Sequence, residues 1–173
     1  VNGETQSNNF NLVVGNVSMV INIDIPEKIE KSSKEDKIKI EARNLQGGTI
    51  KTSGTYEIHN TDGSIIVPPQ TGTFDTGDQA RLLTRIKGLP SGKYRLQVKA
   101  LDSKNNEIEE NKEFIVYSFA DKKPPIETEK WVAQKNIVFD KNNPAEVIFG
   151  TSKKDAYVLY QLSDKEQVFE RRI

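Results

Sequence analysis

The chain has 173 residues, and its 25 basic and 25 acidic side chains cancel to a formal net charge of zero. This balance removes the electrostatic case for a nucleic-acid or anionic-membrane partner, because clustered Lys and Arg side chains bind phosphates. The absence of cysteine excludes disulfides, thiolate metal sites and cysteine nucleophiles.

Period-two alternation of apolar and polar residues predicts β-strands along most of the chain. The first strand covers Ser18–Ile25 and ends at Pro26, which cannot donate a hydrogen bond to a sheet. Further alternating runs are predicted as strands at 37–42, 55–58, 81–86, 94–100 and 112–119. Residues 65–78 are predicted to be irregular, because Pro68 and Pro69 forbid a central strand and turn-forming residues follow them.

About seven strands between residues 9 and 119 predict an all-β fold, an immunoglobulin-like or fibronectin-III-like β-sandwich. Tyr94 fits this prediction, because a Tyr after a Gly turn at the start of the penultimate strand is the position of a tyrosine corner. The alternative for Tyr94 is a plain core aromatic. The side chains expected to face the core share the period of two: Met19, Ile21, Ile23, Ile38, Ile40, Tyr56, Ile58, Leu82, Tyr94, Leu96 and Val98.

A charged segment without periodicity, residues 120–130, contains Pro124 and Pro125 and is predicted to be a semi-rigid linker. Beyond it, Trp131 opens a second set of predicted strands at 137–139, 145–149, 156–162 and 167–172. These residues amount to half a sandwich, and one layer alone cannot close such a fold. We therefore expect residues 131–173 to be the first strands of a second, truncated module, or to pack on the first.

An uncovered half-sandwich exposes apolar side chains and unpaired strand edges. We expect it to dock on the first module or to form a homodimer through its C-terminal strand edges, with two-fold symmetry. The candidate apolar residues are Ile137, Phe139, Val147, Phe149, Tyr157 and Leu159.

Three runs of sequence resemble one known family. They are "KIKIEARNLQGGTIKTSGTYEI", "LPSGKYRLQVKALDSKNNEIEENKEFIVYS" and, after the double proline, "FDKNNPAEVIFGTSKKDAYVLYQL". Together they are similar to the macroglobulin-like repeats of bacterial alpha-2-macroglobulin proteins, particularly the long versions in Bacteroidetes. The resemblance implies a macroglobulin domain at 9–119, a linker at 120–130, and the start of the next module at 131–173.

The resemblance also implies a function and a location. The chain would be a non-catalytic structural module of a large envelope protein that entraps and inhibits proteases. That parent would lie in the bacterial periplasm or at the cell surface, anchored to the membrane. The implied partners are neighbouring domains of the parent and, through it, proteases. Many members carry a Cys-Gly-Glu-Gln thioester, which a chain without cysteine cannot supply. Because the chain begins at Val1 and shows no signal peptide, we expect it to derive from something longer.

Few residues are candidates for chemistry, and each has a plainer interpretation. His59 is the only histidine; no Gly-x-Ser-x-Gly elbow accompanies it, and one histidine without cysteine does not make a zinc site. Asp62, Asp75 and Asp78 lie in turn-rich stretches and supply oxygen ligands of the kind that calcium binds, but Asp is favoured in turns for its own backbone bonding. We therefore predict no enzyme activity, no metal site and no cofactor.

Aromatic residues near the linker leave two interpretations open. Tyr117, Phe119 and Trp131 would suit a sugar-binding platform, or Trp131 would wedge between two modules and fix their angle, which we favour. The first option belongs to the alternative function, a carbohydrate- or protein-binding sandwich module of a secreted or surface protein.

Overall fold

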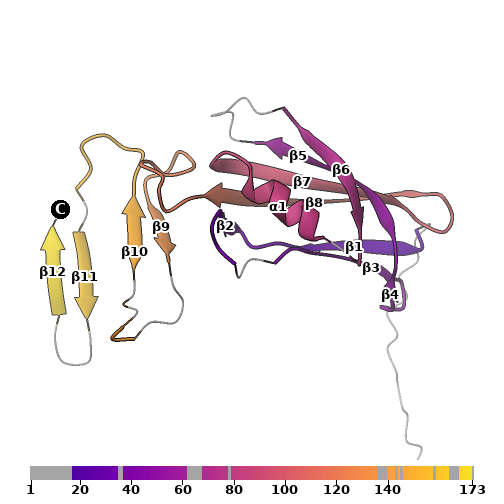
Figure 1. Cartoon of the computed structure of the whole chain (residues 1–173), viewed down its shortest axis with the longest axis horizontal. Coiled ribbons are helices and arrows are strands. Elements are labelled where there is room, and N and C mark those ends of the chain that lie inside the picture. The colour runs from indigo at the N-terminus through magenta and orange to yellow at the C-terminus, as the bar shows by residue number, and fades with distance from the viewer. Residues whose placement is uncertain are drawn as a thin grey trace, which may run out of the picture.

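The computed structural model describes residues 17–34, 37–61, 68–77, 79–135, 140–142, 144 and 146–157, and the backbone of 159–163 and 168–172. This part of the chain is mostly β, with one short helix (Figure 1). The elements in chain order are β1 (Met19–Asp24), β2 (Lys28–Glu30), β3 (Lys39–Asn44), β4 (Thr49–Ile50), β5 (Ser53–Asn60), β6 (Gln70–Asp75), α1 (Ala80–Lys87), β7 (Gly92–Leu101), β8 (Glu107–Tyr117), β9 (Trp131–Gln134), β10 (Val147–Gly150), β11 (Leu159–Ser163) and β12 (Val168–Arg172).

The strands form two larger sheets and two hairpins. A five-stranded sheet has the order β2-β8-β7-β5-β6, and a three-stranded sheet has the order β1-β3-β4. Strands β9 and β10 pair with each other, as do β11 and β12. All pairs are antiparallel except β2 with β8, which is parallel. Figure 1 shows α1 in front of the two larger sheets and the hairpins beyond the end of β8.

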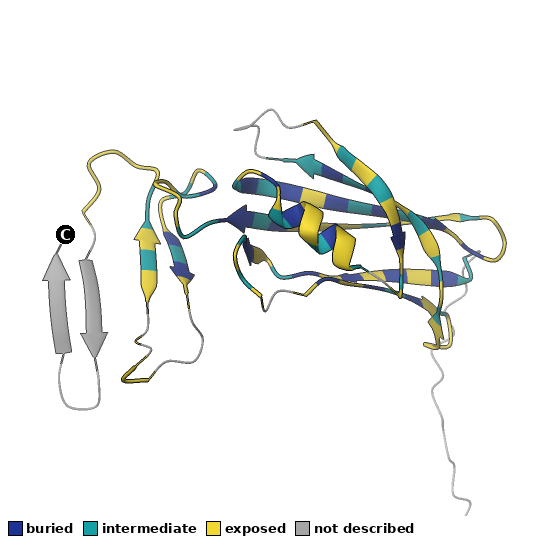
Figure 2. Ribbon diagram, in the orientation of Figure 1, coloured by how far each residue is buried: buried dark blue, intermediate teal, exposed yellow. Residues whose placement is uncertain are grey.

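One hydrophobic core collects side chains from both larger sheets and from α1. The alternation predicted from sequence is visible along β1 and β7, where buried and exposed residues follow each other (Figure 2). Every residue predicted to face the core is buried, and Leu96, Val98 and Ile40 are fully enclosed. The period-two interpretation is therefore confirmed for the core residues that lie in strands; Leu82 is buried from a helix instead.

Tyr94 makes the hydrogen bond of a tyrosine corner. Its hydroxyl donates to the carbonyl oxygen of Pro90 at 2.9 Å, four residues upstream. Its ring stacks on Phe114, with centroids 5.9 Å apart, and is 1% exposed. Of the two interpretations of Tyr94, the corner is the one that this contact supports.

Residues 81–86 were predicted to be a strand, and this prediction is wrong: they lie in helix α1. Leu82 and Ile86 are four residues apart, a spacing that fits one face of a helix as well as one face of a strand. Thr84, which the strand pattern would turn inward, is exposed, while Leu83 packs against the core instead. Because the run is short, its two buried residues could not distinguish the two periods.

The prediction of irregular structure at 65–78 is also wrong for the part that the structure describes. Strand β6 pairs antiparallel with β5 from Gln70 to Asp75. Pro68 and Pro69 stand directly before this strand, and β6 lies at the edge of the sheet, where a missing N–H breaks no ladder. The prolines therefore mark the start of an edge strand.

The C-terminal strands are placed close to the predicted ones. Strand β10 matches the later part of the predicted run at 145–149, β11 overlaps the run at 156–162 and ends one residue after it, and β12 falls within 167–172. The predicted strand at 137–139 lies outside the described residues, while β9, at Trp131–Gln134, is an addition that the alternation did not predict. Within the described residues, no helix has the length and apolar character needed to cross a membrane.

Candidate functional site

The candidate site is the joint between the end of β8 and the start of β9, where three aromatic rings meet. The ring of Tyr117 contacts Trp131 edge-to-face, with centroids 5.4 Å apart, and contacts Phe119 in the same way at 5.5 Å. Tyr117 and Trp131 are 8% and 7% exposed and form a second hydrophobic cluster with Ala133. Trp131 is therefore enclosed rather than displayed.

Lys28 on β2 contacts Trp131 from the β-sheets that precede the proline segment, residues 17–119, which we call the first unit. Its ammonium lies 4.4 Å from the centre of a Trp131 ring, within the range of a cation–π interaction. The same ammonium donates to the backbone carbonyl of Val132 at 2.9 Å. Since β2 and β8 are paired strands of one sheet, Lys28 and Tyr117 contact Trp131 from the same sheet.

The proline-containing segment closes the joint. Pro125 is buried and Ile126 packs against the aromatic cluster. Thr128 ties the segment to the residues after β10, because its N–H donates to Ser152 Oγ at 3.1 Å and its carbonyl accepts from the Ser152 N–H at 2.8 Å. Gly150 allows a close approach here, since a Cβ on it would lie 3.2 Å from the Pro124 ring, which would have to shift by a few tenths of an ångström.

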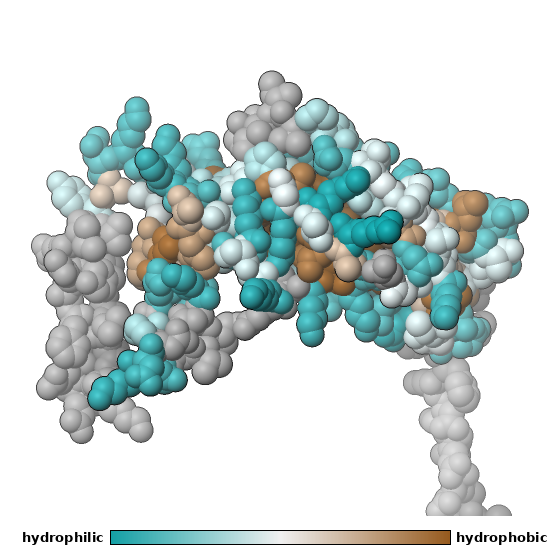
Figure 3. Space-filling view, viewed as in Figure 1, coloured by the Kyte–Doolittle hydropathy of each residue, from teal (hydrophilic) through white to brown (hydrophobic). Residues whose placement is uncertain are grey.

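A small cavity of about 110 Å³ remains at the joint, lined by Tyr117, Phe119, Pro124, Trp131 and Phe149, among others. Figure 3 shows hydrophobic surface over β9 and β10. Phe149 is 51% exposed and its neighbour on the same strand face, Val147, is 42% exposed. Tyr157, also predicted to need cover, is exposed, whereas Ile137 and Phe139 and the side chain of Leu159 lie outside what the structure describes.

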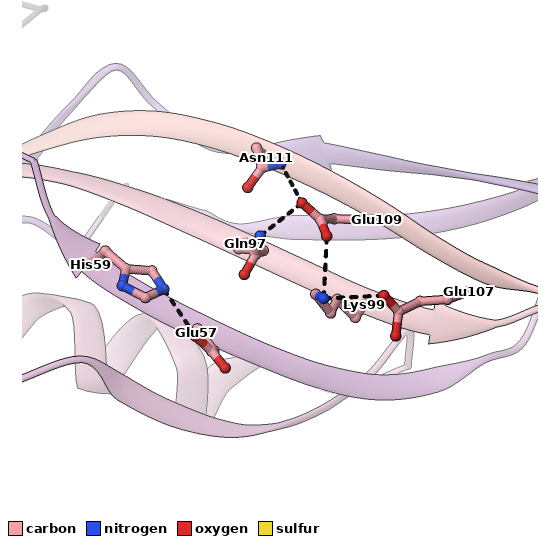
Figure 4. A network of polar contacts seen from close by, with 7 residues as sticks. All are labelled: Glu57, His59, Gln97, Lys99, Glu107, Glu109 and Asn111. Atoms are coloured by element: carbon pink, nitrogen blue, oxygen red, sulfur yellow. Dashed lines mark hydrogen bonds and ion pairs between the residues drawn. The ribbon is translucent and has the colours of Figure 1, made fainter.

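The outer face of the five-stranded sheet is covered by paired charges (Figure 4). Lys99 on β7 contacts two carboxylates of β8, Glu107 at 3.1 Å and Glu109 at 3.3 Å, and these hydrogen bonds raise the pKa of Lys99. Hydrogen bonds from Asn111, Gln97 and Lys99 lower the pKa of Glu109. Both pKa shifts thus favour the ordinary ionised form of the side chain. A catalytic acid or base needs the reverse, a pKa shifted toward neutral pH.

His59 lies at the same face, near the end of β5. Its Nε2 is 2.9 Å from Glu57 Oε2, and the side chains are 39% and 45% exposed (Figure 4). A general base of the serine-hydrolase kind needs a hydroxyl nucleophile in hydrogen-bond reach and a buried orienting carboxylate. The carboxylate here is exposed and comes from the same strand, so the pair is the geometry of a solvated sheet face.

Asp102, at the tip of the β7–β8 hairpin, is the most enclosed carboxylate that the structure describes with several donors. It is 6% exposed and accepts from the N–H and hydroxyl of Ser18, from the N–H of Lys104, and from the N–H and side-chain amide of Asn106. Burial by itself raises the pKa of Asp102, but the hydrogen bonds outweigh it and hold the pKa well below its ordinary value. The carboxylate fixes the start of β1 to the hairpin.

Of the three calcium candidates, only Asp75 lies within the described residues. Asp75 Oδ1 accepts from the Gly77 N–H at 2.7 Å, which is the turn bonding expected of Asp. Asp62 and Asp78 lie outside the described residues. In the part of the chain that the structure covers, no three His, Asp or Glu side chains come together in a way that suits a metal ion.

The comparisons with known proteins add no relative: no family model, no curated protein and no solved structure matches the chain. The joint must therefore be interpreted from its own contacts. Sequence reasoning singled out Trp131, Tyr117 and Phe119 but missed Lys28, whose partner is 103 positions away and leaves no local pattern.

Proposed function

We propose that the chain is a non-catalytic structural module of a large bacterial envelope protein of the alpha-2-macroglobulin kind. The observation that carries the proposal is the joint, in which Lys28 and Tyr117 of one β unit enclose Trp131 of the next. A cation–π contact, a hydrogen bond to Val132 and a buried proline segment together fix one β unit against another. Such a joint suits a shell built from modules in series.

The strand order supports an immunoglobulin-like sandwich, of which the macroglobulin domain is one form. In a variable-type domain, the order β2-β8-β7-β5-β6 would make β2 the second half of the first strand, A, followed by strands G, F, C and C′. The N-terminal strand passes from one sheet to the other, because β1 pairs with β3 and β2 pairs with β8. The Tyr94 corner at the start of the F-like strand adds to this support.

The parent would act by entrapping proteases in the periplasm or at the cell surface, and this module would hold the shell together. The resemblance of residues 37–58, 89–118 and 139–162 to macroglobulin repeats is the support for that role. The module's partners would then be its neighbouring domains. Within such a shell, residues 131–173 would belong to the next module.

Small-angle X-ray scattering of the whole chain tests the structural role. We expect a single, narrow distribution of dimensions that widens in Trp131→Ala and stays narrow in the control Tyr157→Ala, whose ring is 95% exposed and does not line the joint. The same preparation should hydrolyse neither peptides nor glycosides. A reproducible turnover that His59→Ala abolishes, or equal scattering for all three proteins, would contradict the proposal.

A protein-binding module is the second candidate, favoured by the exposed Val147 and Phe149 on β10. A two-strand sheet offers unpaired edges that invite pairing with another chain. In this alternative the hairpins associate with a second copy by two-fold symmetry. Light scattering across a concentration series distinguishes the two candidates. A molar mass that doubles with concentration in the wild type and stays at the monomer value in Phe149→Ser favours the second. The sugar-platform version is disfavoured, since Trp131 is 7% exposed.

A further inference from the structure

The outer edge of β3 is completed by a side chain where a neighbouring strand would be expected. At one end of β3, Asn44 and Gly48 are hydrogen-bonded, and Ala42 pairs with Ile50 of the two-residue strand β4. At Ile40 the Gln79 side chain takes over. The Ile40 N–H donates to Gln79 Oε1 and Gln79 Nε2 donates to the Ile40 carbonyl, both at 2.8 Å. One amide group thus makes the two bonds that a residue of a paired strand would make.

Helix α1 follows Gln79 directly and lies across the space between the two larger sheets. It buries Leu82 and Ile86 in the common core. Arg85 Nη1 donates to the carbonyl of Thr71 on the edge strand β6, at 2.5 Å. The segment from Gln79 to Lys87 therefore contacts the edges of both sheets, and it occupies the place where a further strand beside β3 would lie.

The N-terminal end of α1 is weakly supported as a helix. Gln79 is its N-cap residue but makes no side-chain capping bond, and no acidic residue lies in the first turn. The helix has eight residues, too few to be stable without tertiary packing. Its C-terminal end is better supported, because Arg85 and Lys87 complement the helix dipole.

The same residues carry a strand pattern. Leu82, Thr84 and Ile86 alternate with Leu83 and Arg85, which is the period of an amphipathic strand. Leu82 and Ile86 can face the core in either conformation. Residues 82–86 span about 17 Å when extended and about 7.5 Å in the helix, so the residues that flank them must accommodate a change of about 10 Å.

We propose that residues 80–87 are a helix–strand switch. In the alternative state, residues 82–86 extend, pair with β3 at Ile40 and replace the two hydrogen bonds that Gln79 makes there. The three-stranded sheet gains a strand, and Arg85 leaves the edge of β6. The observation that carries the proposal is the Gln79 amide, which satisfies a strand edge that a backbone strand can satisfy equally well.

Chemical-exchange saturation transfer NMR on the whole chain tests the switch, because ¹³Cα shifts move in opposite directions in helix and strand. We expect a minor state in which residues 82–86 have strand-like shifts. Gln79→Ala removes the two hydrogen bonds to Ile40 and a longer one from Gln79 Nε2 to the Thr76 carbonyl at 3.3 Å, so the minor population should rise about tenfold. The control Gln70→Ala, on β6, removes only a contact with the Pro68 carbonyl and should leave the population unchanged.

A second pair of variants keeps the test valid if Gln79→Ala fails to fold. Thr84 is exposed in the helix and turns inward in the strand. Thr84→Val keeps a similar helix propensity and should raise the strand population, whereas Thr84→Ala should lower it. The proposal is overturned if neither variant shifts the population in these directions, if the minor state has random-coil shifts, or if its population grows with protein concentration, which would indicate pairing between molecules.

Discussion

Leu96 is the best place to measure how much of the stability lies in the core of the five-stranded sheet. It lies on β7 between Ile58 of β5 and Lys112 of β8, and it is fully buried. Leu96→Ala removes the buried side chain and leaves a cavity in the middle of the sheet. Substitutions of this kind cost about 2–5 kcal/mol of unfolding free energy, out of a typical total of about 5–15 kcal/mol.

Leu101→Ala is a matched control, because it makes the same change on the same strand at a side chain that is 58% exposed. Urea unfolding followed by far-UV circular dichroism measures both variants; the single tryptophan is unsuitable as a core probe because it lies at the joint. We expect Leu96→Ala to shift the midpoint at unchanged slope and to lower Tm by about 2–4 °C for each kcal/mol lost. A loss within about 0.5 kcal/mol of the control would refute the assignment of this face to the core.

Three further outcomes are expected. Lys28→Ala should shift the fluorescence of Trp131 to longer wavelength with little change in core unfolding, whereas an unchanged spectrum would mean that Lys28 does not hold the ring. Asp102→Asn should be less stable than the wild type at pH 7. Because the folded-state pKa of Asp102 is lowered, this difference in unfolding free energy should be full above the unfolded pKa of about 4 and should shrink as the pH falls below it. Urea titrations in which the two proteins do not converge at low pH would contradict the role of this carboxylate. Gly54→Ala should destabilise the sheet, because the new Cβ would lie 2.0 Å from the carbonyl of Lys99, and a wild-type Tm would show that the strands separate easily there.

The strands that were predicted correctly are those in which one face is buried and the other is wet. On β1 and β7 alternate residues face opposite sides of the sheet, so the alternation of apolar and polar residues in the sequence predicts which side chains are buried. On α1 the pattern was ambiguous, since two apolar residues four apart satisfy both periods. The edge position of β6 was not predictable from Pro68 and Pro69, because a proline reports only that its own N–H is missing.

Only the aromatic residues of the joint were predictable from the sequence, not the lysine that contacts them. The aromatic residues that flank the proline segment indicated a wedge, and Trp131 is enclosed at that position. Lys28 was not predictable, because its role depends on the parallel pairing that brings β2 beside β8. Gln79 was missed for a similar reason: an amide side chain that completes a strand edge looks like any surface glutamine until the edge is located.

The parallel pairing of β2 with β8 also determines how the first unit would respond to tension. The chain enters this pair from β1 and leaves it at Tyr117 toward the proline segment, so a pull on the two ends drives the strands past each other along their length. Such shear must break the β2–β8 hydrogen bonds together, including Ile115 N–H to Glu27 and Lys31 N–H to Tyr117, whereas peeling would break them one at a time. The unit is therefore arranged to resist a pull applied between the start of β2 and Tyr117.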